Sequence, residues 1–217
     1  MADRPDLDRE DAKTLSRRSF LKGAGGLAAA GTALTNAADA KTAADPNAGS
    51  TGPRRITGEG EIELRINGET RALQAEPRTT LLSALRTRLE PPLTGAKEVC
   101  DRGACGACTV MIDGSPVYSC MQLAHDCVGK DITTVEGLGS PDNLSPVQEA
   151  FWKRDALMCG FCTSGFVVSV SACLERETTV DEATVRSACA GNLCRCGTYP
   201  HVFEAALEAA KSRGAGK

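Results

Sequence analysis

Hydrophobic and polar residues alternate in the first patterned stretch of this chain. EIELRIN, which ends at Asn67, has the alternation of a strand with one buried face. The pair Asn67-Gly68 is a strong turn signal, so ETRALQ after it is predicted to return as the second strand of a hairpin. Asp113-Gly114 predicts another hairpin within CTVMIDGSPVYSC, and DITTVEGL supplies a last strand.

One helix is predicted between the two hairpins. TTLLSALRTRL opens with threonines, which cap helices well, and the pair Pro91-Pro92 ends it. Its leucines share one helical face: Leu81, Leu82, Leu85 and Leu89. The order strand, strand, helix, loop and three strands predicts a small sheet with one helix across it.

From Ser145 onward the hydrophobic period becomes helical. Ser145 and Gln148 flank a proline and have the spacing of a capping box, which predicts a helix in SPVQEAF. TSGFVVSVSACLER is apolar around most of its circumference. Thr179 and Glu182 predict a second capping box, and Gly191 predicts the end of that helix. With YPHVFEAALEAAK these segments predict a bundle of four short helices.

The first forty residues have the features of an export signal. The basic stretch SRRSFLK precedes a Gly/Ala-rich run that ends in Ala-Asp-Ala. Paired arginines followed by Phe and Leu match the twin-arginine signal, whose route carries folded proteins with cofactors in place. Gly, Thr and Asn dilute the run and Asp39 ends it, so we expect no membrane anchor. We predict a signal peptide over residues 1–40 and export to the periplasm.

Composition divides the rest of the 217-residue chain. Residues 41–57 are rich in Ala, Pro and Gly without periodicity, which predicts a linker. Gly, Ser, Pro and Asp cluster between Gly137 and Asn143, and this predicts a border between domains at 58–137 and 143–213. The net charge of −3 indicates neither nucleic acid nor an anionic membrane as a partner.

The chain has eleven cysteines, an odd number that fits poorly with a scaffold of disulfides alone. A first set follows C-x4-C-x2-C-x11-C: Cys100, Cys105, Cys108 and Cys120. The spacing of the first three cysteines is the plant-type [2Fe–2S] signature. Three thiols on one loop can surround one side of a cluster, and the fourth comes from the far strand of the hairpin. Gly103 and Gly106 allow positive φ close to the cluster, where neighbouring N–H groups can point at its sulfides.

A second set lies in MCGFCTSG and GNLCRCGTYP: Cys159, Cys162, Cys194 and Cys196. Each pair directly precedes a predicted helix. Because helix N-termini favour anions and a thiolate-bound cluster is anionic, four thiols at two helix starts can bind a second pair of irons.

Zinc is the main rival for either set, because four thiolates also bind structural zinc. The long loop and hairpin of the first set differ from the paired C-x2-C knuckles of zinc fingers. The C-x-C spacing is less diagnostic, so zinc or disulfides stay open for the second set. Export ordinarily favours disulfides, but cofactor insertion in the cytoplasm weakens that argument.

EVCDRGACGACTV, CGFCTSG and GNLCRCGTY, in this order, resemble the small iron–sulfur subunit of the xanthine dehydrogenase / aldehyde oxidase family of molybdenum hydroxylases. With the export signal, the chain is most similar to the periplasmic aldehyde oxidoreductase branch. The resemblance covers about residues 58–213. It implies an α+β chain, in which an N-terminal β-grasp, 2Fe-2S ferredoxin-like domain precedes a C-terminal four-helix-bundle domain that binds [2Fe–2S]. All eight ligand positions are present, and Cys196 matches a ligand beside the pterin.

The resemblance implies an electron-transfer subunit with two [2Fe–2S] clusters and no substrate chemistry of its own. A large partner subunit carries the molybdopterin cofactor, and a medium partner carries FAD. Electrons pass from molybdenum through the helical-domain cluster and the ferredoxin-domain cluster to flavin or another acceptor. An N-heterocycle or xanthine-type hydroxylase is the alternative within the family. A stand-alone exported ferredoxin and a secreted disulfide-bonded binding module are the alternatives outside it.

The sequence departs from the family pattern at two positions. Met158 stands where the family usually has Gln, and Ser164 where it usually has Pro. Met158 cannot make the polar contact to pterin expected of the Gln, whereas Ser164 can serve at a helix start. Arg195, between two ligands, either raises a cluster's reduction potential by its charge or lies on a docking surface, and we favour the docking surface.

The other cysteines and the histidines are predicted to be structural. Cys127, Cys173 and Cys189 are expected to be small buried apolar residues. His125 and His201 are expected at the surface or in packing, because their spacing from the cysteine pairs argues against a Rieske centre.

Overall fold

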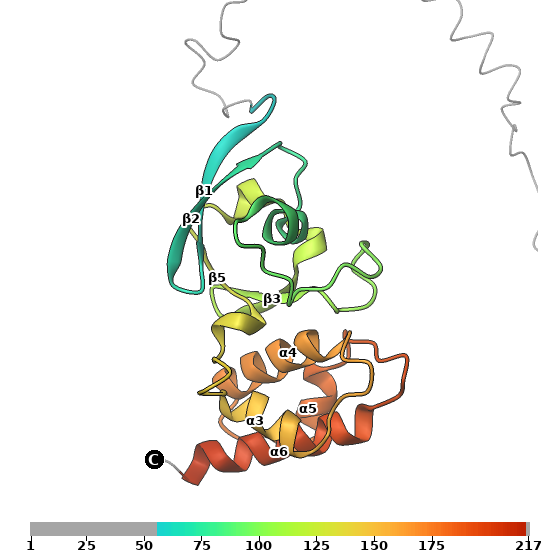
Figure 1. Cartoon of the computed structure of the whole chain (residues 1–217). Coiled ribbons are helices and arrows are strands. Elements are labelled where there is room, and N and C mark those ends of the chain that lie inside the picture. Colours follow the sequence, from blue (N-terminus) through green and yellow to red (C-terminus); the bar gives the residue numbers. More distant parts are fainter. Residues whose placement is uncertain (1–55, 216–217) are drawn as a thin grey trace, which may run out of the picture. The chain divides into compact units, whose positions relative to one another are not determined.

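The alternating stretches form a five-stranded mixed sheet (Figure 1). The strands are β1 (Gly60–Ile66), β2 (Glu69–Ala75), β3 (Thr109–Ile112), β4 (Ser115–Tyr118) and β5 (Asp131–Thr133). Their order is β2-β1-β5-β3-β4, in which β1 and β5 are parallel and the other neighbours antiparallel. The computed structural model describes residues 56–215, so the predicted signal peptide and nearly all of the predicted linker lie outside the described residues.

Both predicted hairpins are confirmed. Asn67 and Gly68 have φ of 51° and 84°, and Asp113 and Gly114 have φ of 49° and 72°. Two successive residues with positive φ match the right-handed twist of the flanking strands, which is why Asn-Gly and Asp-Gly favour such turns.

The predicted helix begins where expected, but its second part is a π-helix rather than an α-helix. The Thr80 hydroxyl accepts a 3.2 Å hydrogen bond from the Ser83 N–H, and α2 (Leu81–Ser83) continues directly into a π-helical segment, Ala84–Arg88. All four predicted leucines are at most 3% exposed. They belong to one core cluster with Leu64 and Val110, so the helix covers one face of the sheet.

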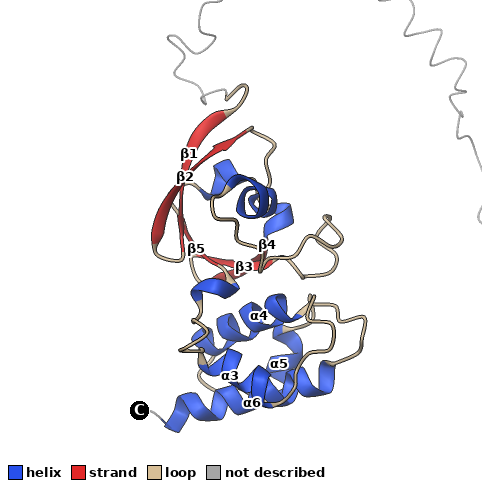
Figure 2. Ribbon diagram, viewed as in Figure 1, coloured by secondary structure: helices blue, strands red, loops and turns tan. Residues whose placement is uncertain are grey.

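Four helices follow the sheet, as predicted (Figure 2). They are α3 (Pro146–Lys153), α4 (Thr163–Arg176), α5 (Glu182–Ala188) and α6 (Tyr199–Ala215). The capping box of Ser145 and Gln148 is confirmed, because each side chain accepts from the other's backbone N–H. The box predicted from Thr179 is wrong: Asp181 caps α5 by accepting a 2.8 Å hydrogen bond from the Thr184 N–H. This helix ends at Ala188, before the predicted stop at Gly191.

The second face of the sheet packs on the helices. Met111 of β3 forms a buried cluster with Val168 and Ala172 of α4. A separate core lies among α3, α4, α5 and α6, with Phe166 fully buried in it. Three short 3-10 turns complete the described structure: Ser119–Met121, Ala124–Cys127 and Val135–Gly137. The predicted α+β class is confirmed, and none of the helices within residues 56–215 has the length and apolarity that a membrane span requires.

Candidate metal centres

The first cysteine set surrounds one loop and the turn beside it. Cys100, Cys105 and Cys108 lie on the loop before β3. Cys120 was predicted on the far strand of the hairpin, but it lies in the 3-10 turn directly after β4. Backbone N–H groups point at the sulfurs: Gly103 donates to Cys120 Sγ and Ala104 donates to Cys100 Sγ, both at 3.3 Å.

Gly103 and Gly106 both have φ of 69°, a conformation that glycine adopts without the cost of a Cβ. The loop therefore folds back toward its own thiols. This backbone directs N–H groups inward, which suits an anionic cluster.

The second set lies at two helix starts. Cys162 is the N-cap residue of α4, and Cys194 and Cys196 lie in the loop before α6. Thr198 contacts Cys194 Sγ twice, through its backbone N–H at 3.4 Å and its hydroxyl at 3.0 Å. The N–H of Cys194 donates to the Tyr199 hydroxyl at 2.9 Å, which fixes this loop on α6.

The eight thiols form four pairs. In the first set, hydrogen-bonding contacts join Cys100 to Cys105 and Cys108 to Cys120. In the second set, Cys159 Sγ and Cys196 Sγ are 3.7 Å apart, and Cys162 contacts Cys194. Within residues 56–215, no three His, Cys, Asp or Glu side chains gather around one point as a single metal ion would need. Pairs suit a binuclear cluster, because each tetrahedral iron takes two thiolates and two bridging sulfides.

One thiol of each set ionises near neutral pH. A hydrogen bond from the Arg102 backbone, followed by that of the Cys105 thiol, lowers the pKa of Cys100 to about 7. Burial raises the pKa of Cys194, but hydrogen bonds from Thr198 outweigh it and lower that pKa to about 7. By contrast, burial raises the pKa of Cys162 to about 12. The thiolate is the form that binds metals, so each set presents one ligand ready to bind.

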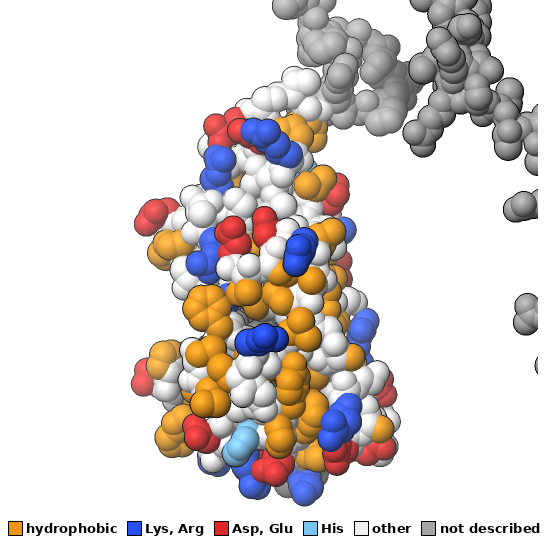
Figure 3. Space-filling model, turned by 90° about the vertical axis from the view of Figure 1, so that its right-hand side faces the viewer, with side chains coloured by type: hydrophobic (Ala, Val, Ile, Leu, Met, Phe, Trp, Pro, Cys, Tyr) orange, Lys and Arg blue, Asp and Glu red, His pale blue; other side chains and the backbone are white. Residues whose placement is uncertain are grey.

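The two sets differ in exposure. Cys108 and Cys120 are 3% and 6% exposed, whereas Cys159 and Cys196 lie exposed at the surface. Large apolar side chains beside both sets are exposed: Met158 at 68%, Phe161 at 55% and Leu193 at 56% beside the second set, and Val99 at 56% and Met121 at 60% beside the first. Figure 3 shows hydrophobic side chains gathered on one face, and Figure 1 shows the cysteine loops on that side. Such a patch indicates an interaction surface.

A backbone hydrogen bond joins the loops that hold the two cysteine sets. The Leu193 N–H, next to Cys194, donates to the carbonyl oxygen of Cys105 at 2.9 Å. Asn192, which the sequence analysis did not single out, lies beside this bond and is 3% exposed. The sequence pointed to this residue only through its position two residues before Cys194.

The three cysteines outside both sets and the two histidines lie as the sequence predicted. Cys127, Cys173 and Cys189 are buried, as predicted. His201 is exposed, and its Nδ1 lies 3.1 Å from the carbonyl oxygen of Arg154. His125 lies in the 3-10 turn Ala124–Cys127 and is partly buried, as expected.

Met158, Ser164 and Arg195, which the sequence analysis discussed, lie on or next to the loops of the second set. Arg195 and Met158 are exposed. Ser164 lies in the first turn of α4, but its buried hydroxyl has no hydrogen-bond partner within the described residues. It therefore does not cap the helix.

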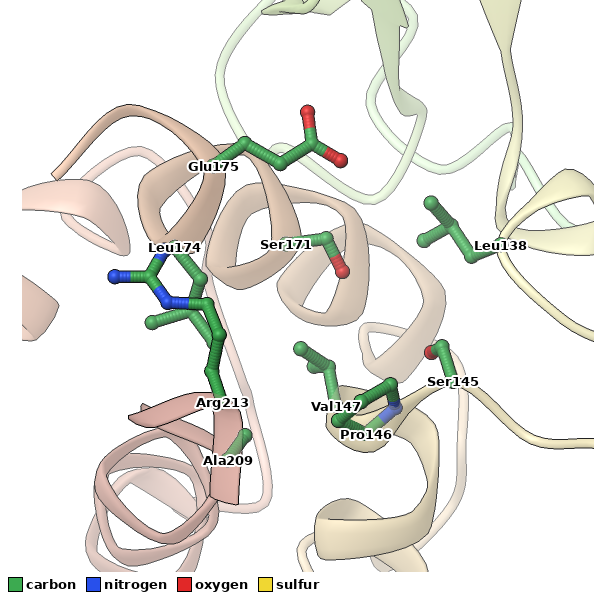
Figure 4. Close-up of a pocket in the computed structure, with 9 residues that line it drawn as sticks. All are labelled: Leu138, Ser145, Pro146, Val147, Ser171, Leu174, Glu175, Ala209 and Arg213. Atoms are coloured by element: carbon green, nitrogen blue, oxygen red, sulfur yellow. The ribbon is translucent and has the colours of Figure 1, made fainter. Parts of the chain in front are cut away.

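An apolar cavity of about 210 Å³ lies among α3, α4 and α6 (Figure 4). Leu138, Val147 and Leu174 line it, and the Ser171 hydroxyl, without a partner in the described part of the chain, faces it. No cysteine lines this cavity, so it is separate from both thiol sets.

Three family models match the chain. A 2Fe-2S iron-sulfur cluster binding domain matches residues 65–159, a [2Fe-2S] binding domain matches 134–207, and a TAT (twin-arginine translocation) pathway signal sequence matches 14–33. The chain therefore has two [2Fe–2S]-binding domains and a signal for export across the cytoplasmic membrane.

The chain is similar to subunits whose names refer to different substrates. The aldehyde oxidoreductase iron-sulfur-binding subunit PaoA of Escherichia coli O157:H7 is 39% identical over 214 residues, 91% of this chain and 89% of that protein. The nicotine 6-hydroxylase small subunit of Paenarthrobacter nicotinovorans is 45% identical over 149 residues, 69% of this chain and 88% of that protein. The crystal structure of quinoline 2-oxidoreductase from Pseudomonas putida 86 superposes with a TM-score of 0.67 at 38% identity, covering 73% of this chain and 98% of that one.

Proposed function

The chain belongs to the family of small iron–sulfur subunits of molybdenum hydroxylases, and on this premise we propose that it transfers electrons within an exported, periplasmic aldehyde oxidoreductase. The extent of the match to PaoA of Escherichia coli O157:H7, together with the export signal, carries this proposal. That alignment spans 91% of the chain, whereas the matches to PaoA of strain K12 and to the nicotine 6-hydroxylase subunit each span 69%. The additional length includes N-terminal sequence, where the export signal lies.

The pairing of thiols supports an assignment of ligands to individual irons. Each cluster, when bound, accepts and releases one electron at a time. The thiol pairs proposed to hold the irons are Cys100 with Cys105, Cys108 with Cys120, Cys159 with Cys196, and Cys162 with Cys194. Gly103 and its neighbours would direct N–H groups at the first cluster, and Thr198 would donate to the second.

Exposure supports a direction of transfer. Cys159 and Cys196 are exposed and lie on the same loops as the exposed Met158, Phe161 and Leu193, and a large molybdopterin-binding subunit would dock on the patch that these three apolar residues form. The first set would then pass electrons to a FAD-binding subunit or another acceptor. In this scheme the chain conducts electrons and binds no substrate.

The proposed organisation keeps the bounds expected from composition. A signal peptide over residues 1–40 and a linker over 41–57 would precede the ferredoxin-type domain at 58–137 and the helical domain at 143–213. Gly103, Gly106 and the sheet lie in the first of these domains. Helices α3 to α6 lie in the second, except for the last two residues of α6.

A hydroxylase of N-heterocycles is the second candidate. The nicotine 6-hydroxylase subunit is 45% identical, and the quinoline 2-oxidoreductase chain is covered over 98% of its length. Both proteins show that the same small-subunit architecture serves ring substrates.

The two candidates separate when the complete complex is purified through a tag on this chain. We expect about four irons per chain, two in each cluster, and rapid cluster reduction by an aldehyde under anaerobic conditions. Reduction by nicotine or quinoline but not by aldehydes would favour the second candidate. About two irons per chain would contradict the assignment of both clusters.

A further inference from the structure

A buried junction centred on Asn192 connects the two cysteine sets. Its amide nitrogen donates to the carbonyl oxygen of Gly106 at 2.9 Å and to the Thr109 hydroxyl at 3.3 Å. Its amide oxygen accepts from the Ser169 hydroxyl at 2.8 Å. One side chain therefore ties together the first cysteine loop, the start of β3, helix α4 and the loop of the C-x-C pair.

Three glycines make this close approach possible. A Cβ on Gly106 would lie 2.5 Å from the Gly191 carbonyl oxygen, and one on Gly165 would lie 2.3 Å from the Gly106 carbonyl oxygen. A Cβ on Gly191 would lie 1.8 Å from the Tyr118 hydroxyl, which donates to the Gly191 carbonyl oxygen at 3.1 Å. A larger residue at Gly106 or Gly165 would meet backbone and push these segments apart, whereas one at Gly191 would displace the Tyr118 side chain.

Only a side-chain amide satisfies all the partners of Asn192. It provides two donors and an acceptor in one plane. Aspartate would keep the bond from Ser169, but it would lose both donors and place a charge in a buried site. Alanine would leave the hydroxyls of Ser169 and Thr109 without this partner.

We propose that Asn192 is a positioning residue that sets the separation between the two clusters. The proposal rests on the proposed function, because it requires a cluster at each cysteine set. Electronic coupling between redox centres falls exponentially with their separation, so a small displacement of these loops changes the transfer rate. Within residues 56–215, Asn192 has no hydrogen bond to a cysteine sulfur, so it acts on distance rather than on either cluster's potential.

The test uses the complete purified complex with Asn192→Leu and Asn192→Ala, which remove the amide without adding a charge. Each cluster's own EPR signal and midpoint potential should persist. The splitting that arises from magnetic interaction between the two reduced clusters should decrease, and electron transfer between them should slow severalfold. Asn143→Ala, at an exposed asparagine, should change neither quantity.

The outcomes distinguish this inference from the proposed function. Unchanged splitting and rate in both Asn192 variants would overturn the inference, and so would loss of either cluster's own signal, because Asn192 would then be needed for cluster binding. If neither variant folds, Tyr118→Phe decides: it removes only the bond to Gly191 and should reduce the splitting to a smaller extent, whereas unchanged splitting would overturn the inference. A wild-type complex without two clusters would instead refute the proposed function.

Discussion

The backbone N–H of Leu193 donates a 2.9 Å hydrogen bond to the carbonyl oxygen of Cys105. Leu193 is bonded covalently to Cys194, so one hydrogen bond and a few covalent bonds connect a thiol of the second set to a thiol of the first. This connection gives the two candidate centres a route for electron transfer through protein bonds. It also means that each cysteine set can be tested by its effect on the other.

Cys194→Ser should interrupt the route at the second set. The Cys194 thiol pairs with Cys162 and has a pKa of about 7, so its loss removes a ligand that is readily ionised. We expect the second cluster's EPR signal to disappear and the first cluster's signal to remain after chemical reduction. Substrate should no longer reduce the first cluster in the complete complex. Survival of both EPR signals would contradict the ligand assignment.

Cys105→Ser should have the complementary effect. Loss of the Cys105 thiol leaves Cys100 without its partner. Because metal ligands organise such loops, the first cluster should be lost. Iron content should fall from about four to about two per chain, while substrate still reduces the second cluster. Cys127→Ser provides the matched control, since this buried cysteine belongs to neither set and should leave iron content unchanged.

Phe161→Asp should weaken binding of the large subunit. Phe161 is 55% exposed next to Cys162, and a carboxylate placed there would be desolvated when a partner covers the patch. Co-purification with the large subunit should drop, while this chain keeps both clusters. Val128→Asp, at an apolar side chain that is 49% exposed on the sheet side, is the control. Equal losses from both variants would mean that the patch beside the second set is not specific for that partner.

Local chemistry explains which parts of the fold could be predicted. Asn67-Gly68 and Asp113-Gly114 determine their turns through their own backbone preferences, and the capping box at Ser145 is complete within four residues. The start of α5 was missed because two candidate caps lie close together, and the carboxylate of Asp181 reaches the free N–H groups of the helix better than Thr179 does.

Long-range contacts explain what the sequence could not predict. The spacing of the cysteines indicated two sets, but not how the thiols pair within each set. Asn192 and Gly106 are 86 positions apart, and no periodicity indicates that an amide will meet a carbonyl across that separation. Cys120 was expected on the far strand of the hairpin, whereas that strand ends at Tyr118 and the chain continues as a 3-10 turn.

Phe166→Ala should destabilise the helical part of the chain. Phe166 is fully buried, and its ring packs edge-on against Tyr199 with 5.9 Å between ring centroids. Removing a buried phenylalanine ring typically lowers the free energy of unfolding by about 3–5 kcal/mol. Because Tyr199 holds the Cys194 N–H, the second cluster should also be lost at a lower temperature than the first. Trp152→Ala, at a side chain that is 71% exposed, should change the free energy of unfolding by at most about 0.5 kcal/mol.

Arg17→Lys combined with Arg18→Lys should retain the protein in the cytoplasm. Both positions lie within the stretch that matches the twin-arginine signal, and lysine keeps the positive charge while removing the planar guanidinium. An effect of charge alone would therefore leave export unchanged, whereas recognition of the arginine pair would abolish it. Cell fractionation should find the variant in the cytoplasm with both clusters bound, because cofactor insertion precedes export. Arg9→Lys, outside the matched stretch, should be exported normally. Export of the double variant at the wild-type level would contradict the assignment of this signal.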